Sequence, residues 1–294
     1  MKISFLIVTK NRPNELAFTL NKLKPMLDLS VHEVLVFIDG CKQTEKLIER
    51  FDWVNWSISE KSISASPARN KLYKKAKGCI FIGLDDDAHP LSLDFISSVE
   101  AEFNSNKKLG IIAFQEVRGQ FGSDAEALAQ AKNRTPHFTN DFVGCGFAIK
   151  KDVYKSSNGF PVWIDIYGEE PALALEVLNL GYQILYQPKI KVNHRVNAEQ
   201  RKKQGKNYFR FKHQLQNSIR FYVVYYPNPV FQILKLLWHN FKKYAITDGV
   251  YFKSFISVLF ETVCFLPKLL KHRAPVKQST IKHKSNLKTL NYSA

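Results

Sequence analysis

Short apolar runs, rich in β-branched side chains, alternate with amphipathic stretches along the first two thirds of the chain. Successive apolar positions predict strands buried on both faces, and apolar positions three or four apart predict helices with one buried face. The predicted strands are residues 3–9, 32–39, 54–59, 79–84 and 110–117. The predicted helices are residues 14–24, 43–50, 66–77, 92–104 and 169–179, with Asn14 and Ser66 as N-caps of the first and third. This βαβα order predicts an α/β fold with a mostly parallel, Rossmann-like sheet covered by helices on both faces.

Polar side chains directly follow three of the predicted strands. Residues 9–11 end the first strand, Asp39-Gly40 ends the second, and Asp85-Asp86-Asp87 follows the strand at residues 79–84. Ligands of open parallel sheets bind beyond the carboxyl ends of the strands. We therefore expect a binding site where these three segments meet.

The acidic triplet has the most specific chemistry of the three. Asp85 and Asp87 lie two residues apart, so an extended backbone points both carboxylates to one side. Carboxylate oxygens suit Mg²⁺ or Mn²⁺, and such ions keep coordination positions for phosphate oxygens. The triplet therefore indicates a metal site with a phosphate-bearing ligand. A turn that caps the helix after Pro90 is the structural alternative.

Two further features have both a structural and a chemical interpretation. Glu169-Glu170 begins a predicted helix, where the pair either complements the helix dipole or supplies a general base. His194 ends the run at residues 189–193 and is either a structural hydrogen-bonding residue or a metal ligand. We expect Trp163 and Tyr167, just before the acidic pair, to pack in the core or a loop rather than to stack on a sugar.

Several short motifs occur in the order found in one known family. They are Thr9-Lys10-Asn11-Arg12 after the opening strand, residues 36–40 (VFIDG), Ala68-Arg69-Asn70, residues 84–87 (LDDD), residues 142–151 (FVGCGFAIKK), Gly159-Phe160, Gly168-Glu169-Glu170, Gly181-Tyr182 and Val192-Asn193-His194. On these motifs residues 1–196 resemble an inverting family 2 glycosyltransferase of the GT-A fold, of the type that builds bacterial cell-surface polysaccharides. The chain departs from the family at Ile38 and Cys41, which replace an Asp and a Ser, and at Glu176, which replaces an Arg.

The resemblance implies metal-dependent transfer of a sugar from a nucleotide-diphosphate sugar, UDP- or dTDP-linked, to a hydroxyl of a saccharide or lipid-linked saccharide. The implied nucleotide-sugar residues are Thr9, Asn11, Arg12, Asp39, Arg69, Asp85 and Asp86. The implied ligands of Mn²⁺ or Mg²⁺ are Asp87, Asp85 and His194. Glu170, ahead of Glu169, takes the place of the catalytic base. Asp39 would accept a hydrogen bond from N3–H of the pyrimidine, and Arg69 would neutralise charge on the leaving diphosphate.

Charge divides the chain into two parts. Residues 197–294 hold 18 Lys and Arg against 3 Asp and Glu, so the first 196 residues carry only +2 of the formal charge of +17. The four cysteines lie far apart without a Cys-x-x-Cys pair, which argues against a zinc site or a disulfide framework and suits a reducing, cytoplasmic compartment. The first apolar run is too short for a signal peptide, so we expect no export.

The basic part is predicted to form amphipathic helices. Apolar residues line one face of residues 230–244 and of residues 252–266, with lysines on the opposite face of the first. Lys253, Glu261 and Pro267 interrupt the second, so we expect no membrane span. We expect residues 198–270 to lie on the anionic inner face of the cytoplasmic membrane, between a catalytic domain at residues 1–197 and a flexible basic tail at residues 271–294. Packing of these helices on the catalytic domain is the alternative.

Two other functions fit parts of the sequence. A GT-A-like nucleotidyltransferase would also combine a parallel sheet, a metal and a nucleotide, but residues 10–13 lack the glycines of its phosphate loop. A non-enzymatic nucleic-acid-binding module would use the basic tail. Since no RRM, KH or zinc-finger signature is present, we do not expect nucleic acid as a partner.

Overall fold

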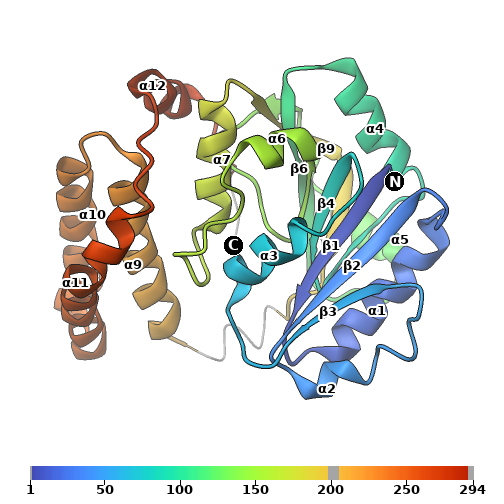
Figure 1. The fold of residues 1–294 in the computed structure, drawn as a ribbon, viewed down its shortest axis with the longest axis horizontal. Helices are drawn as coiled ribbons and strands as arrows, with labels where there is room; N and C mark the ends of the chain where they lie inside the picture. The colour runs from blue at the N-terminus through green and yellow to red at the C-terminus, as the bar shows by residue number, and fades with distance from the viewer. Residues whose placement is uncertain (1, 198–204, 291–294) are drawn as a thin grey trace.

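A nine-stranded sheet forms the centre of the molecule (Figure 1). The computed structural model describes residues 2–197 and 205–290. The strands are β1 (Ile3–Thr9), β2 (His32–Asp39), β3 (Asn55–Ser59), β4 (Ile80–Asp85), β5 (Ala88–Pro90), β6 (Leu109–Arg118), β7 (His137–Phe138), β8 (Gly146–Lys150) and β9 (Gln183–His194). Their order in the sheet is β3-β2-β1-β4-β8-β6-β9-β5, and β7 pairs with β9. All five strands predicted from the apolar runs are present within one or two residues.

The first half of the sheet is parallel, as predicted. β1 pairs with β2 and β4, and β2 pairs with β3, all in parallel register. The second half is mixed: β8 lies antiparallel between β4 and β6, and β5 and β7 are antiparallel to β9. The expectation of a mostly parallel sheet is therefore corrected to a mixed one. The pattern 142–151 contains β8, but its apolar character does not reveal the strand's direction.

Helices cover both faces of the sheet (Figure 1). Their bounds are α1 (Pro13–Leu23), α2 (Lys42–Glu45), α3 (Ala65–Tyr73), α4 (Phe95–Ser105), α5 (Asp124–Ala129), α6 (Lys151–Ser156) and α7 (Glu169–Asn179). α1 and α4 pack on one face of the sheet, where Phe5 and Ile7 of β1 point. α3, α6 and α7 pack on the other face, against Leu6. Since successive side chains of a strand point to opposite faces, β1 contributes to both cores.

Several predicted helix boundaries are wrong. α3 ends at Tyr73 rather than near residue 77, and α4 begins at Phe95 rather than near residue 92. α1 begins at Pro13 with Arg12 before it, so Asn14 is not its N-cap. α2 ends at Glu45 rather than near residue 50. α3 begins at Ala65 after Ser64, because the hydroxyl of Ser66 donates to the Pro161 carbonyl, 2.7 Å away, and does not cap the helix.

The C-terminal region is a helical layer beside the central sheet (Figure 1). It consists of α9 (Tyr208–Tyr225), α10 (Val230–Lys243), α11 (Gly249–Leu270) and α12 (Gln278–Asn286), with a short 3₁₀ turn at Ala245–Thr247. α9 packs against Trp163, Ile164 and Leu175, whereas α10 has no buried residue. α9 thus packs on the sheet domain, and contact of the two following helices with a membrane stays a prediction.

α11 is longer and more continuous than its sequence suggested. Judged by length and composition alone, it is the one helix of the described chain that could cross a membrane. Only 17% of its most apolar window is buried.

The end of the chain also differs from the expected flexible tail. α12 contacts α7, where Thr280 donates to the Asn179 side chain at 3.0 Å. The side chain of Leu290 is 6% exposed in the core beside α7. The segment is ordered by contacts with residues far away in the sequence, which its own low apolar content does not reveal. Residues 291–294 of the predicted tail lie outside the described part of the chain.

Candidate functional site

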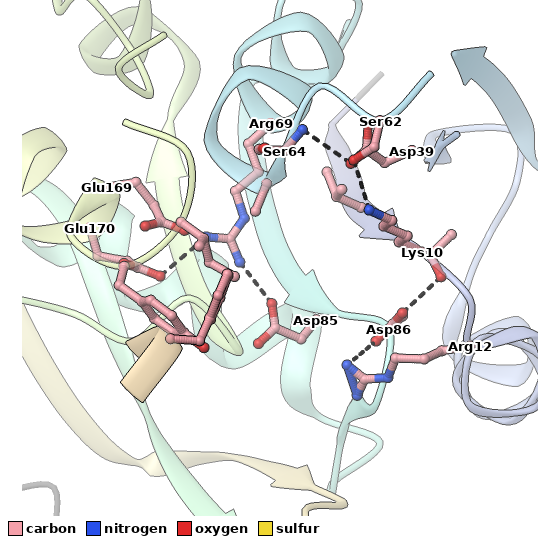
Figure 2. A pocket seen from close by; sticks show the side chains of 16 residues that line it. Lys10, Arg12, Asp39, Ser62, Ser64, Arg69, Asp85, Asp86, Glu169 and Glu170 are labelled. Carbon is pink, nitrogen blue, oxygen red and sulfur yellow. Dashed lines mark hydrogen bonds and ion pairs between the residues drawn. The ribbon is translucent and has the colours of Figure 1, made fainter. Parts of the chain in front are cut away.

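The carboxyl ends of β1, β2 and β4 and the start of α7 surround a pocket of about 420 Å³ (Figure 2). Of the residues predicted from the sequence, those lining it are Thr9, Arg12, Asp39, Arg69, Asp85, Asp86, Glu169 and Glu170. Asp87 and His194 lie next to Asp85 but do not line the pocket, and neither does Asn11. The three predicted strand ends therefore meet in one site.

The acidic triplet is held in place by hydrogen bonds and ion pairs from α1 and β1. Asp86 accepts a hydrogen bond from the Thr9 hydroxyl at 2.7 Å and pairs with Arg12 at 2.9 Å. Burial raises the pKa of Asp86 to about 7, although Arg12 opposes this shift. Arg12 also pairs with Asp87, so its guanidinium bridges two of the three carboxylates. Asp85 instead turns toward the pocket, where it pairs with Arg69 at 2.7 Å.

One set of side chains in the site fits a divalent metal ion. Asp85, Asp87 and His194 each offer a ligand atom, and these atoms lie within 4.8 Å of one another. Oδ1 of Asp87 is buried and accepts no hydrogen bond from the described residues. Burial opposes ionisation of Asp87, but His194 and Arg12 lower the pKa of this carboxyl well below its usual range. Two carboxylates and an imidazole form a donor set that suits Mn²⁺ and accommodates Mg²⁺.

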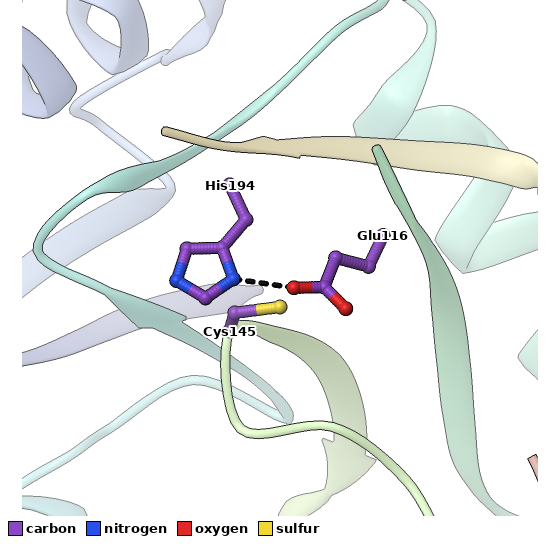
Figure 3. A group of neighbouring side chains, drawn as sticks. All are labelled: Glu116, Cys145 and His194. Atoms are coloured by element: carbon purple, nitrogen blue, oxygen red, sulfur yellow. Dashed lines mark hydrogen bonds and ion pairs between the residues drawn. The ribbon is translucent and has the colours of Figure 1, made fainter. Parts of the chain in front are cut away.

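His194 is held between the carboxylates of Asp87 and Glu116. Figure 3 shows its contact with Glu116, with Cys145 beside the ring. Its Nε2 lies 3.3 Å from Asp87 Oδ1, and its Nδ1 lies 2.5 Å from Glu116 Oε1 on β6. Cys145, at the start of β8, completes the cluster. Burial disfavours the imidazolium, but Cys145, Asp87 and Glu116 together raise the pKa of His194 above its ordinary value. The sequence analysis missed Glu116 and Cys145; a single acid near the end of an apolar strand was the available signal for Glu116.

Arg69 joins the two acidic groups across the pocket (Figure 2). Its Nη1 lies 3.1 Å from carboxylate oxygens of both Glu169 and Glu170, while Nη2 binds Asp85. The close approach requires Gly144, because a Cβ there would overlap Oε1 of Glu170 and the Arg69 guanidinium. One buried cation thus fixes the carboxylates from β4 and from α7 in one arrangement.

The two glutamates differ in their access to the pocket. The side chain of Glu170 is 19% exposed, whereas that of Glu169 is 4% exposed. Burial, with the charge of Glu170 next to it, raises the pKa of Glu169 to about 8. Burial thus favours a proton on Glu169 near neutral pH, and Glu170 is the more accessible member of the pair.

Asp39 has a structural role in addition to its position in the pocket. Oδ1 accepts from the Ile63 backbone at 2.6 Å, and Oδ2 accepts from the Ser62 hydroxyl at 2.6 Å and the Ser64 backbone at 3.2 Å. Ser64 has φ of +75°, a conformation that costs free energy and often occurs at functional sites. Asp39 therefore shapes the pocket wall, and its contact with a nucleotide base stays a prediction.

α9 contributes to the site in a way that the sequence did not reveal. Phe209 lines the pocket. Nδ2 of Asn217 donates to the Asp165 carboxylate and the Ile166 carbonyl, both at 2.8 Å, and to the Tyr167 carbonyl at 3.2 Å. Tyr167, which has φ of +68°, also lines the pocket, whereas Trp163 packs in the core as expected. The loop that leads into the Glu169-Glu170 pair is thus held by the C-terminal region.

Glu176, where the family has Arg, is part of the same junction. It accepts hydrogen bonds from the Tyr225 hydroxyl at 2.5 Å and from the Asn158 backbone at 2.6 Å. These contacts tie α7 to α9 and to the turn before Gly159. An acidic side chain at this position therefore has a structural explanation.

The sheet order and the site at its carboxyl edge define an α/β protein with the GT-A fold. Solved structures similar to the chain include GalNAc-T7 with UDP, GalNAc and Mn²⁺, with a TM-score of 0.61, 16% identity, and coverage of 79% of this chain and 49% of that one. Another is the mannosyltransferase PcManGT from Pyrobaculum calidifontis in complex with GDP-Man and Mn²⁺, with a TM-score of 0.58, 14% identity, and coverage of 97% and 83%. S. aureus TarS 1-349 in complex with UDP-GlcNAc has a TM-score of 0.61, 14% identity, and coverage of 88% and 80%.

The chain thus spans about half the length of GalNAc-T7 and most of the other two. No protein-family model and no curated protein matches its sequence. At these identities the likeness shows the fold, and the activity has to be argued from the site.

Proposed function

We propose that the chain is a metal-dependent, inverting glycosyltransferase that uses a nucleotide-diphosphate sugar as donor. The observation that carries this proposal is that Arg69 joins two groups of side chains at one site of a GT-A fold. The first is the candidate metal-binding set, which Arg69 contacts through Asp85. The second is the accessible carboxylate of Glu170. The similar structures carry UDP, UDP-GlcNAc or GDP-Man, two of them with Mn²⁺, which supports a donor of this class. We assign the chemistry to residues 1–197 together with α9.

The donor side of the pocket is assigned to the strand ends. Asp85, Asp87 and His194 would hold Mn²⁺ or Mg²⁺, and the bound ion would offset the charge that grows on the departing diphosphate. Arg12, which pairs with Asp86 and with Oδ2 of Asp87, would add positive charge beside the diphosphate. Thr9, Asn11 and Asp86 border the nucleotide.

The acceptor side is assigned to the start of α7. Glu170 takes the proton from the acceptor hydroxyl as the oxygen attacks the anomeric carbon, and Glu169 is the second candidate for this role. Arg69 keeps the carboxylate in place and adds positive charge beside the leaving group. A single displacement from the face opposite the diphosphate inverts the anomeric configuration.

The finer assignments are part of the same proposal. The donor base is uracil or thymine, read by Asp39 through N3–H, and the acceptor is a saccharide or lipid-linked saccharide in surface polysaccharide synthesis. The proposed location is the cytoplasm, at the inner face of the cytoplasmic membrane. A GT-A-like nucleotidyltransferase, the second candidate, would exchange pyrophosphate instead of transferring sugar, so an exchange assay separates the two.

The donor pocket is tested by thermal unfolding with UDP, dTDP, GDP and CDP, each with and without Mn²⁺. A ligand that binds the native state raises the melting temperature. We expect a metal-dependent rise with one pyrimidine diphosphate, and its loss in Asp87→Ala. A folded protein that no nucleotide stabilises would contradict the proposed donor site, and a response to GDP alone would reassign the base.

The base is tested by Glu170→Gln, which keeps the shape of the side chain but removes its proton affinity. We expect transfer to fall by about 100-fold or more while metal-dependent nucleotide binding is retained. Glu169→Gln is the matched comparison and should cost less. Transfer at the wild-type rate in Glu170→Gln would overturn the assignment.

A further inference from the structure

α10 and α11 expose large apolar side chains that no other part of the described chain covers. They are Val230, Phe231, Leu234, Trp238, Ile246, Val250, Phe252, Ile256, Phe260, Val263 and Leu270. More than half of the exposed large apolar side chains of the described chain lie in this segment and in the turn that joins the two helices. Phe231 and Phe260 are 71% and 72% exposed. Single exposed apolar residues are ordinary, but a concentration of this kind marks an interaction surface.

The basic and acidic side chains of the same segment have different surroundings. Its five lysines, Lys235, Lys242, Lys243, Lys253 and Lys268, are all exposed. Its two acids face α9 instead: Asp248 binds Lys206 and Glu261 binds Lys212, each at 2.6 Å. The outward surface of α10 and α11 therefore presents lysines and apolar side chains without an opposing carboxylate.

α11 is fastened along its length to the domain that carries the site. At the start of α11, Asp248 accepts hydrogen bonds from Tyr208, the first residue of α9, and from Lys206 just before it. In its middle, Glu261 accepts from Lys212 and from Gln216 at 2.9 Å.

The other end of α11 returns to the same body. Arg273 donates to backbone carbonyls at the end of α9, including that of Pro227 at 3.0 Å, and the backbones of Ala274 and Val276 donate to Val224 and Tyr225. A helix of 22 residues is about 33 Å long, close to the thickness of the hydrocarbon core. A spanning helix would place its ends on opposite sides of a bilayer, whereas both ends of α11 are attached to one rigid partner, α9.

We propose that the chain docks on an anionic lipid bilayer through the outer faces of α10 and α11, and that both helices lie along the bilayer surface without crossing it. Aromatic and aliphatic side chains enter the acyl boundary while the lysines remain at the headgroups. A second copy of the chain would bring the same lysines face to face, and nucleic acid would leave the apolar side chains in water. The inference does not depend on the proposed transferase activity.

The test is co-sedimentation of the full chain with vesicles of phosphatidylcholine, alone or mixed with phosphatidylglycerol. We expect binding to the mixed vesicles that weakens with added salt and is much weaker on phosphatidylcholine alone. The triple substitution Phe231→Ser/Trp238→Ser/Phe260→Ser, the outer-face variant, should abolish binding. The matched control changes exposed apolar residues outside the segment, Ile58→Ser/Leu93→Ser/Val162→Ser, and should bind as the wild type does. Lys242→Gln/Lys243→Gln should weaken binding by about 30-fold.

Four outcomes would overturn the proposal. The first is a folded wild-type chain that sediments with neither vesicle, and the second is an outer-face variant that binds normally. The third is wild-type self-association that the outer-face variant removes, without vesicle binding, which would make the surface a contact between copies. Alkaline carbonate should release a chain that is bound at the surface of the vesicles. The fourth outcome is its retention, which would show that α11 crosses the bilayer.

Discussion

His194 connects the proposed metal site to the interior of the sheet. Asp87 faces one ring nitrogen and Glu116 faces the other, so the ring has one orientation that satisfies both. A carboxylate on the second nitrogen of a ligating histidine sets its tautomer and raises its basicity as a ligand. At the residue scale, Glu116 therefore acts through His194 on the metal and not on the substrate.

Glu116→Gln should weaken binding of Mn²⁺ in the presence of nucleotide by about 10–100-fold. The amide has nearly the same volume but gives up the ion pairs with His194 and Arg118, so the melting temperature of the metal-free protein should also fall and is measured alongside. Titration calorimetry and the electron paramagnetic resonance signal of free Mn²⁺ both measure this affinity without an activity assay. Glu49→Gln, at an exposed position, is the control, and equal affinities in the two variants would contradict the role of Glu116.

α9 determines the conformation of the loop before the acidic pair. Asn217 is 1% exposed and donates to three acceptors in residues 165–167. Backbone strain at Tyr167 and the positive φ of Gly168 persist only when such contacts over-determine the loop. At the element scale, a helix from the C-terminal region thus aligns Glu169 and Glu170 at the start of α7.

Asn217→Ala should lower the free energy of unfolding by about 1–3 kcal/mol, because three partly buried acceptors lose their donor. It should also lower the rate of sugar transfer by about 10–100-fold through misplacement of Glu170, while nucleotide binding at the strand ends is retained. Chemical denaturation and transfer kinetics measure the two effects. Gln214→Ala on the exposed side of α9 is the control. A rate loss no larger than that of the control would show that the loop holds its shape without Asn217.

At the scale of the whole molecule, the end of the described chain docks on residues 139–141, in the middle of the sequence. The hydroxyl of Thr139 donates to the Lys288 carbonyl at 2.8 Å, and Asn140 donates to the Lys284 carbonyl at 3.1 Å. Asp141 follows in this segment, with Glu170 and Lys284 as its charged neighbours. Burial raises the pKa of Asp141 to about 7, and the charge of Glu170 adds to the increase. Docking of the chain end therefore has a cost in stability that depends on pH.

Asp141→Asn should stabilise the protein above about pH 7 and have little effect near pH 4. The pKa of Asp141 is raised in the folded state, so between about pH 4 and pH 7 the folded chain keeps a proton that the unfolded chain has released. The wild type therefore loses stability as the pH rises through this interval. We expect a gain of about 2–4 °C in melting temperature at the higher pH for each kcal/mol recovered. Thermal unfolding at several pH values measures it, with Asp52→Asn at an exposed position as the control. A gain that does not vary with pH would contradict the raised pKa.

Much of the donor side of the site could be predicted from the sequence. The strands at residues 3–9 and 32–39 and the helix Glu169–Asn179 coincide with β1, β2 and α7, and the acidic triplet follows β4 at the predicted edge. Burial on both faces and helical periodicity are local properties, so a few consecutive residues carry them. The polar residues at strand ends then meet because parallel strands share one carboxyl edge.

The direction of β8, the position of α9 and the contact of Glu116 with His194 were decided only by the tertiary structure. Each joins residues far apart in the chain: 78 positions separate Glu116 from His194, and 52 separate Asn217 from Asp165. Such pairings result from competition among all segments for partners, which no local pattern records. The sequence thus predicts the elements that build the edge of the sheet with the site and the chemistry that they present, while packing determines which side chains orient that chemistry and which helix faces remain uncovered.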